Sequence, residues 1–216
     1  MEKRGNNNME IYSRVINDVM NGGLLDLGEA LYEENKKTYK HCRRVFDYCF
    51  MIGQKLRLSV VELEYLAVAA FYHDVGKIGI SKKILDKPVA LTGDEMTIME
   101  THPRISARVL RAAGGSNEAV KALACHHERY DGKGYPYGIC GENIPLLARI
   151  LAVADAYSAM TSVRSHARTL VKEEALDRLA VGGGTQFDPQ IVGSFIEQVE
   201  AAQLYTQGED REEEVA

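Results

Sequence analysis

Apolar residues recur at every third or fourth position along most of the chain, and no stretch alternates apolar and polar residues over a useful length. Glycine, proline and polar clusters separate the apolar stretches. This pattern predicts an all-α fold, a helical bundle with no real sheet. The helices are expected near residues 11–20, 38–56, 59–74, 92–115, 117–127, 146–162, 169–180 and 188–201.

Two of these helices begin with a capping box, in which a hydroxyl and a carboxylate satisfy free backbone N–H groups. Ser59 precedes Glu62 by three residues, and Thr92 precedes Glu95 by three. The helix after Ser59 contains "LEYLAVAAFY", which is apolar almost all round and predicts burial on most sides. Pro145 lies where a first-turn proline is expected.

The breaks between helices divide the chain into one main domain and two ends. The main domain is predicted to span residues 38–205, after an N-terminal helical segment at 1–37 and before an acidic tail at 206–216 that is predicted to be disordered. Two loops interrupt the helices. They are "GKIGISKKILDKPVALTG" and the glycine- and proline-rich "ERYDGKGYPYGICGENIP".

Composition narrows the classes of function. The chain has 216 residues and a net charge of −5, so it lacks the basic surface of a protein that binds nucleic acid polymers. No stretch approaches the roughly 18 apolar residues of a membrane span, and the N-terminus has no apolar signal region, so a cytoplasmic location is expected. The four cysteines lack CxxC spacing and are expected to be reduced and buried: Cys42, Cys49, Cys125 and Cys140.

His73 and Asp74 stand at the end of the buried helix. A buried carboxylate is costly unless a cation compensates it, and a metal ion is one such cation. Neighbouring side chains on a helix point about 100° apart, so the backbone must turn for both to reach one ion. Gly76 is expected to allow this turn through a positive φ. The alternative is a capping aspartate beside a core histidine.

Further imidazole and carboxylate groups lie on other predicted helices. Metal sites in helical bundles are built from side chains on facing helices, so this spread favours a metal site over the capping alternative. The candidates are His41, His102, His126, His127 and Asp155.

Five motifs in order give the chain a specific resemblance over about residues 38–195. They are "HDVGKIGI", the histidine of "THPRI", "HHERYDGKGYP", "ARILAVADAYSAMTSVR" and "GTQFDP". Together they resemble the HD-GYP family, a branch of the HD metal-dependent phosphohydrolases. The resemblance implies an HD-type helical bundle with iron or manganese in its core. It also implies hydrolysis of cyclic di-GMP to a linear dinucleotide or GMP.

The resemblance also implies a role for each matching residue. His41, His73, Asp74 and Asp155 resemble the ligands of one metal ion, and Asp74 would bridge to a second ion held by His102, His126 and His127. A hydroxide bridging the two ions would then attack the phosphodiester. Lys77 matches a lysine that contacts the scissile phosphate, with a solvated loop lysine as the alternative.

Substrate and partner contacts are implied at two further places. Gly134, Tyr135 and Pro136 form the GYP motif, which the resemblance connects with site shape and with diguanylate cyclase (GGDEF) partners; a plain turn would use the same residues. Arg164 matches a substrate-binding arginine. It is followed by Ser165 and His166 where the family often has proline and tyrosine. The missing aromatic ring removes a surface on which a base could stack.

Two other departures concern the site itself. Ser106 stands where the family tends to have glycine, and it is expected to crowd the helix contact near His102. In three-metal members a glutamate one turn before the first histidine helps to hold an extra ion, and here that position is Lys37. We therefore expect two divalent ions.

Three functions remain open from the sequence. The first is a cyclic di-GMP phosphodiesterase. The second is a phosphohydrolase for another cyclic dinucleotide or nucleotide, and the third is a catalytically silent receptor or partner-binding module. A complete set of candidate ligands favours an enzyme.

Overall fold

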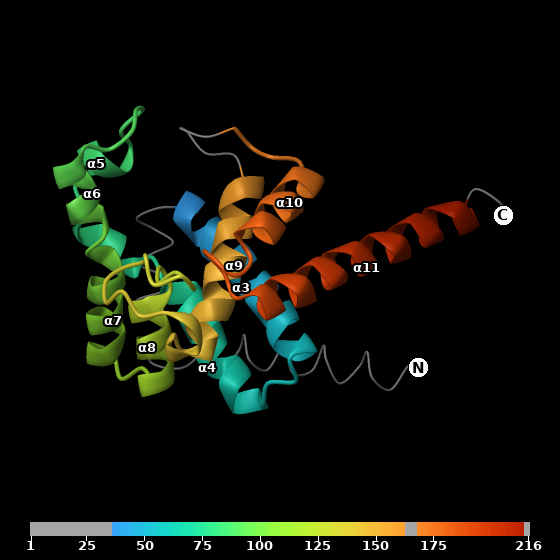
Figure 1. The fold of residues 1–216 in the computed structure, drawn as a ribbon, viewed down its shortest axis with the longest axis horizontal. Helices are drawn as coiled ribbons and strands as arrows, with labels where there is room; N and C mark the ends of the chain where they lie inside the picture. The colour runs from blue at the N-terminus through green and yellow to red at the C-terminus, as the bar shows by residue number, and fades with distance from the viewer. Residues whose placement is uncertain (1–35, 163–167, 214–216) are drawn as a thin grey trace.

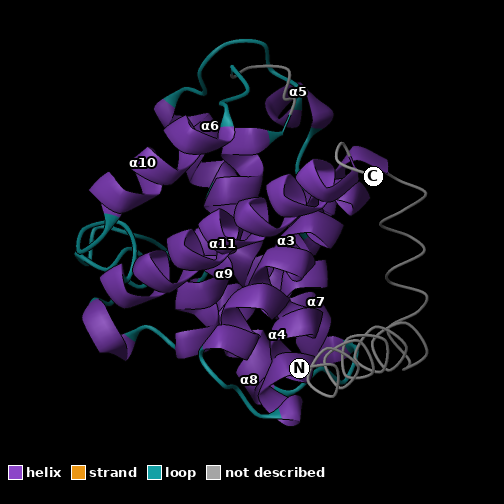
Figure 2. Cartoon of the chain, turned by 90° about the vertical axis from the view of Figure 1, so that its right-hand side faces the viewer, coloured by secondary structure: helices purple, strands orange, loops and turns teal. Residues whose placement is uncertain are grey.

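The computed structural model describes residues 36–162 and 168–213, and in these ranges the chain is helical with no strand (Figure 2). The predicted all-α class is confirmed. A single isolated bridge joins Gly183 and Phe187 in the described part. The α-helices are α3 (Lys36–Lys55), α4 (Val60–Tyr72), α5 (Lys82–Leu85), α6 (Gly93–Met99), α7 (His102–Ala112), α8 (Asn117–Cys125), α9 (Leu146–Thr161), α10 (Lys172–Gly182) and α11 (Pro189–Glu213).

Four of these helices, α3, α4, α8 and α9, pack against one another around the main core (Figure 1). Helix α4, which is apolar almost all round, is buried on most sides as predicted, because it contacts each of the other three helices. Helix α7 packs on α8 on one side of the bundle, whereas α10 and α11 pack on α9 on the other. No helix within the described ranges is long and apolar enough to cross a membrane.

Both predicted capping boxes are present. The Ser59 backbone N–H donates to Glu62 Oε2 at 2.8 Å, and the Glu62 N–H donates back to Ser59 Oγ at 3.3 Å. Thr92 and Glu95 make the same pair of contacts at 2.7 and 3.3 Å. These local bonds fix where α4 and α6 begin.

The long helix predicted over residues 92–115 is wrong, because the structure divides it into α6 and α7. Proline lacks the backbone N–H that would continue the hydrogen bonds of α6, and Pro103 is in the first turn of α7. The break falls at Glu100 and Thr101. His102 therefore begins a new helix instead of lying in the middle of an old one.

The "GTQFDP" motif forms the turn between α10 and α11. Asp188 accepts hydrogen bonds from the backbone N–H groups of Gln190 and Ile191, and its carboxylate pairs with Arg149 of α9 at 2.5 Å. The motif thus ties the start of α11 to α9. Helix α11 continues to Glu213, beyond the predicted end at residue 201, whereas the predicted helix at 11–20 lies outside the described residues.

Three of the four cysteines are buried free thiols, as predicted: Cys42, Cys49 and Cys125. Burial raises the pKa of the Cys125 thiol to about 11, so this group is protonated at neutral pH. Cys140 is also free but exposed, so its predicted burial is wrong. It lies in the turn-rich loop before α9, where no helix covers it.

Candidate metal centre

All seven candidate ligands from the sequence come together in the bundle. They are delivered by separate elements: His41 by α3, His73 and Asp74 by the turn after α4, His102 by α7, His126 and His127 by the end of α8, and Asp155 by α9. They form two groups of three residues with Asp74 between them.

The first group consists of His41, His73 and Asp155, whose ligand atoms all lie within 4.8 Å of one another. His41 Nε2 is 3.0 Å from Asp155 Oδ1, and His73 Nε2 is 3.9 Å from the same oxygen. Two imidazole nitrogens and one carboxylate oxygen therefore converge on one point. Such a mixed nitrogen and oxygen donor set suits iron or manganese.

The second group consists of three imidazoles, those of His102, His126 and His127, again within 4.8 Å. His127 Nε2 lies 3.2 Å from His102 Nε2. The ring of His126 is tilted against that of His127, with centroids 4.1 Å apart. His126 and His127 are neighbours in sequence, and both reach the site because α8 ends just before them.

Asp74 lies between the two groups. Its Oδ2 is 3.5 Å from His73 Nε2 in the first group, and its Oδ1 is 3.6 Å from His102 Nε2 in the second. Its backbone has φ −98° and ψ 1°, a sparsely populated region that active-site residues often occupy. One carboxylate can therefore face both groups.

The imidazoles are held from behind. The Nδ1 atoms of His73, His102 and His126 lie 2.7–2.8 Å from the carbonyl oxygens of the residues three positions earlier. A carbonyl can only accept, so each Nδ1 must carry the proton, and each Nε2 is left with a lone pair. Partners of this kind commonly orient metal-binding histidines.

His41 has a different partner, Ser158, whose Oγ is 2.9 Å from His41 Nδ1. No motif in the sequence points to Ser158 as part of the site. A signal existed, because Ser158 follows Asp155 by three positions and so shares its face of α9.

The charge states of the cluster suit cation binding. Burial lowers the pKa of His73 and His126, and it lowers those of His102 and His127 to about 4. These four imidazoles are therefore neutral at pH 7, as metal ligands must be.

The two carboxylates are held in their charged form. Burial alone would raise the pKa of Asp74, but the Lys77 ammonium outweighs it and leaves that pKa well below its usual range. Burial likewise opposes ionisation of Asp155, yet its hydrogen bond from His41 lowers the pKa well below normal.

Two buried nitrogen atoms in the cluster lack a hydrogen-bond partner. They are His73 Nε2 and His126 Nε2, whereas the Asp74 carboxylate is paired with Lys77 Nζ at 2.7 Å. Unsatisfied buried polar atoms are costly, and coordination to a cation would satisfy them. The residues present therefore fit metal ions.

The turn at the HD pair does not work as expected. Gly76 is absent from the glycines with positive φ, so its predicted conformational role is wrong. It is needed for space, because a Cβ there would lie 2.3 Å from the carbonyl oxygen of His102. Ser106 does not crowd this contact, since its hydroxyl bonds to the turn itself.

The GYP motif folds back on the histidine pair. The Tyr135 ring stacks on His127 with centroids 5.0 Å apart, and Gly134 packs so tightly that a Cβ would meet the Arg129 backbone N at 2.2 Å. Glu128, which the sequence analysis missed, is buried, and its Oε1 accepts from the Tyr137 N–H at 2.6 Å. The motif thus supports one wall of the candidate site.

Three residues of the substrate-binding prediction lie outside the described residues: Arg164, Ser165 and His166.

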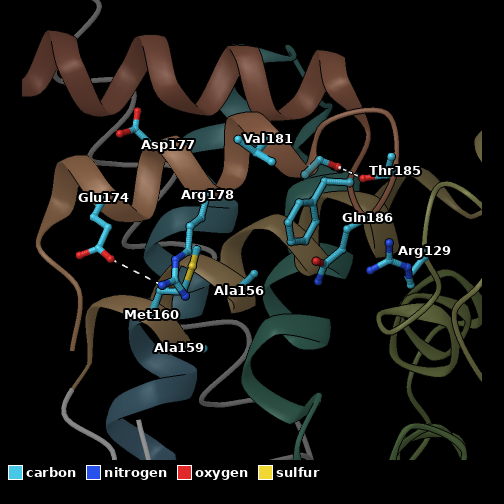
Figure 3. Close-up of a pocket in the computed structure, with 12 residues that line it drawn as sticks. Arg129, Ala156, Ala159, Met160, Glu174, Asp177, Arg178, Val181, Thr185 and Gln186 are labelled. Carbon is cyan, nitrogen blue, oxygen red and sulfur yellow. Dashed lines mark hydrogen bonds and ion pairs between the residues drawn. The ribbon is translucent and has the colours of Figure 1, made fainter. Parts of the chain in front are cut away.

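A pocket of about 630 Å³ lies between α9, α10 and the turn before α11 (Figure 3). Its lining includes Ala156 and Met160 of α9, but none of the seven candidate ligands and not Lys77. The Arg178 guanidinium at its edge is paired with Glu174 at 3.5 Å. The pocket is thus separate from the candidate metal centre.

Comparison with known proteins agrees with this geometry. A family profile described as "HD domain" matches residues 27–191. The chain is 39% identical over 172 residues to the cyclic di-GMP phosphodiesterase response regulator RpfG of Xanthomonas campestris pv. campestris, covering 79% of this chain and 46% of that protein. It is 32% identical over 174 residues to the 3'3'-cGAMP-specific phosphodiesterase 2 of Vibrio cholerae, covering 80% and 33%.

A solved structure shares the fold. Bd1817, an HDG"Y"P protein from Bdellovibrio bacteriovorus, superimposes with a TM-score of 0.61 at 18% identity, covering 76% of this chain and 52% of that one. The chain spans less than half the length of the two phosphodiesterases it matches above. The predicted resemblance to HD-GYP proteins is confirmed.

Proposed function

This chain belongs to the HD domain family, and on that premise we propose that it is a metal-dependent phosphodiesterase of cyclic dinucleotides. The observation that carries the proposal is the pair of ligand groups with Asp74 between them. A single structural histidine would need no such arrangement. Two ions about 3.5–4 Å apart are a recurring device for phosphate ester cleavage.

We assign His41, His73 and Asp155 to one ion and His102, His126 and His127 to the other, with Asp74 shared. When bound, two divalent ions supply an activated water at neutral pH and neutralise charge on the phosphodiester. The donors suit iron or manganese, although affinity alone would also permit zinc or nickel.

Lys77 is assigned to the substrate. Its ammonium lies 2.7 Å from the Asp74 carboxylate, and about a third of its side chain (32%) is exposed. A long side chain at the edge of the cluster can turn toward an anionic phosphate without leaving the site. It would hold the scissile phosphate against the ions and stabilise the charge that develops on it.

Cyclic di-GMP is the substrate we place first, because RpfG is named as a phosphodiesterase for it. Hydrolysis would give the linear dinucleotide and, if it continues, GMP. The second candidate is 3'3'-cGAMP, because another relative is named for that substrate. Ser165 and His166 stand where an aromatic contact to a base is often found, which also favours testing both.

The test is turnover by protein purified anaerobically and loaded with Mn²⁺ or Fe²⁺. Cyclic di-GMP, 3'3'-cGAMP and cyclic di-AMP should be supplied separately, and the linear products separated by chromatography. We expect cyclic di-GMP to have the highest kcat/KM. A higher value for 3'3'-cGAMP would support the second candidate, and tight binding without turnover would support the silent receptor.

Asp74→Ala is the decisive variant. Removal of the shared carboxylate should release metal and reduce turnover to the background rate, because both ions lose a ligand at once. Asp131→Ala is the matched control, since this carboxylate pairs with Arg129 and is not a candidate ligand. Near-normal activity and full metal content in Asp74→Ala would contradict the proposal.

Recognition of a diguanylate cyclase by the GYP loop and a cytoplasmic location stay predictions. Tyr137, immediately after the motif, is 58% exposed and offers an aromatic contact to such a partner.

A further inference from the structure

We propose that Ser106 is a positioning residue that fixes the spacing between the two ligand groups; this inference rests on the proposed function. Its side chain is fully buried, and its hydroxyl makes two hydrogen bonds to one turn of the chain. The Oγ donates to the carbonyl oxygen of His73 at 2.6 Å and accepts from the N–H of Gly76 at 2.9 Å.

These two bonds enclose Asp74. The His73 carbonyl precedes Asp74 in the chain and the Gly76 N–H follows it. The Ser106 hydroxyl therefore holds the backbone on both sides of the shared carboxylate. A buried N–H or carbonyl that loses its partner is costly, which gives the clamp its strength. The turn therefore cannot rotate without breaking at least one of the two bonds.

The other end of the clamp is α7. Ser106 lies four positions after His102, so the two side chains share a face of that helix. His102 Nε2 is 3.6 Å from Asp74 Oδ1. A shift of α7 relative to the turn would therefore change the distance between the second ligand group and the shared carboxylate.

Gly76 makes the contact close enough for the clamp to form. A Cβ on Gly76 would lie 2.7 Å from the Ser106 backbone N and 2.9 Å from its Oγ. Because Gly76 has no Cβ, the α7 backbone can pack against the turn. The Ser106 hydroxyl then satisfies the His73 carbonyl oxygen and the Gly76 N–H. Glycine in place of Ser106 would permit the same approach but would leave the turn without its clamp.

The test is metal binding by Ser106→Ala. The protein should be stripped of metal and titrated with Mn²⁺, with bound ions followed by electron paramagnetic resonance, which detects coupling between neighbouring ions. We expect affinity for the second ion to fall roughly 10- to 100-fold, as is typical when a contact behind a metal ligand is removed. Affinity for the first ion should change little, and kcat should fall more than KM changes.

Two further variants separate positioning from general stability. Ser116→Ala removes the hydroxyl that caps the start of α8 by accepting a hydrogen bond from the Ala119 N–H. Ser116 is at the opposite end of α8 from His126 and His127. This variant should lower Tm without altering Mn²⁺ binding. Ser106→Thr keeps the hydroxyl and should retain most of the affinity for the second ion.

The outcomes distinguish the two proposals. If the unaltered protein binds no coupled pair of ions, both the proposed function and the role of Ser106 fail. If it binds the pair and Ser106→Ala binds it equally well, only the role of Ser106 fails. Equal losses in the alanine and threonine variants would also overturn it, because volume rather than the hydroxyl would then be responsible.

Discussion

Lys77 and Asp74 illustrate how single residues balance charge in this site. The carboxylate is buried, and burial alone would favour its neutral form, but the ammonium 2.7 Å away helps to keep it ionised. The same ammonium is partly exposed and can face an incoming phosphate. One residue is thus assigned both to the resting charge balance and to the substrate.

Lys77→Ala should lower kcat and kcat/KM together while metal content stays unchanged. The lost charge would act mainly on the transition state, and Lys77 is not itself a metal ligand. Steady-state kinetics and elemental analysis check the two parts separately. Lys83→Ala, an exposed lysine in α5, is the control and should behave as the unaltered protein. Unchanged kinetics in Lys77→Ala would make it a surface lysine.

Lys37 bears on the number of ions. It lies within α3, four residues before His41, which is the spacing of one helical turn. A charged ammonium cannot bind a metal ion and repels one nearby. Elemental analysis of anaerobically purified protein should therefore give about two ions per chain, and Lys37→Glu should raise this number. A value near three in the unaltered protein, with no increase in the variant, would show that another group completes the site.

At the scale of elements, the centre depends on where helices end. Helix α4 ends before the HD pair, α8 ends before His126 and His127, and α7 begins at His102. A side chain just beyond a helix end can point along the axis, which a side chain in the middle of a helix cannot do. The helix ends thus bring residues adjacent in sequence to one site.

The contact between the HD turn and α7 gives a prediction about stability. Gly76→Ala should destabilise the metal-free protein by about 1–3 kcal/mol or more, because the new Cβ would overlap the backbone of α7. Gly79→Ala is a matched control in the same 3-10 helix, since a Cβ there meets nothing within 4 Å. Urea unfolding measures both, and equal stabilities would contradict the packing seen here.

At the scale of the whole molecule, the bundle surrounds its ionisable groups with apolar helices. Buried apolar side chains form the core around the imidazoles. This burial lowers the pKa values of His102 and His127 and keeps both rings neutral. The metal-free fold therefore carries groups that resist protonation. Acid should act on the entire bundle, because these groups lie where its main helices meet.

The metal-free protein should lose stability as pH falls from about 6.5 to about 4. His102 and His127 have folded-state pKa values lowered from 6.5 to about 4, so the unfolded chain binds more protons across this range. Unfolding is therefore favoured as pH decreases. Urea midpoints measured in a chelator at several pH values check this, and His102→Gln should reduce the dependence. A flat profile would mean that these imidazoles are not buried in solution.

The local features of the chain were predictable from sequence because they depend on neighbouring residues. The boxes at Ser59 and Thr92 are short-range hydrogen bonds, so their letters alone locate the starts of α4 and α6. The apolar circumference of α4 likewise predicted its burial. The seven candidate ligands were recognised as imidazole and carboxylate groups on separate predicted helices, and the resemblance then implied their roles, which stay predictions.

Other features were decided only by tertiary structure, because they join residues distant in the chain. The sequence predicts a positive φ at Gly76, but glycine is required there because the backbone of α7, about thirty positions later, leaves no room for a Cβ. The sequence predicts crowding at Ser106, whereas its hydroxyl makes hydrogen bonds to two peptide groups of that turn. The sequence by itself determined the helices and the chemical groups. The packing of the helices determined which backbone atoms meet, and so how those groups are held.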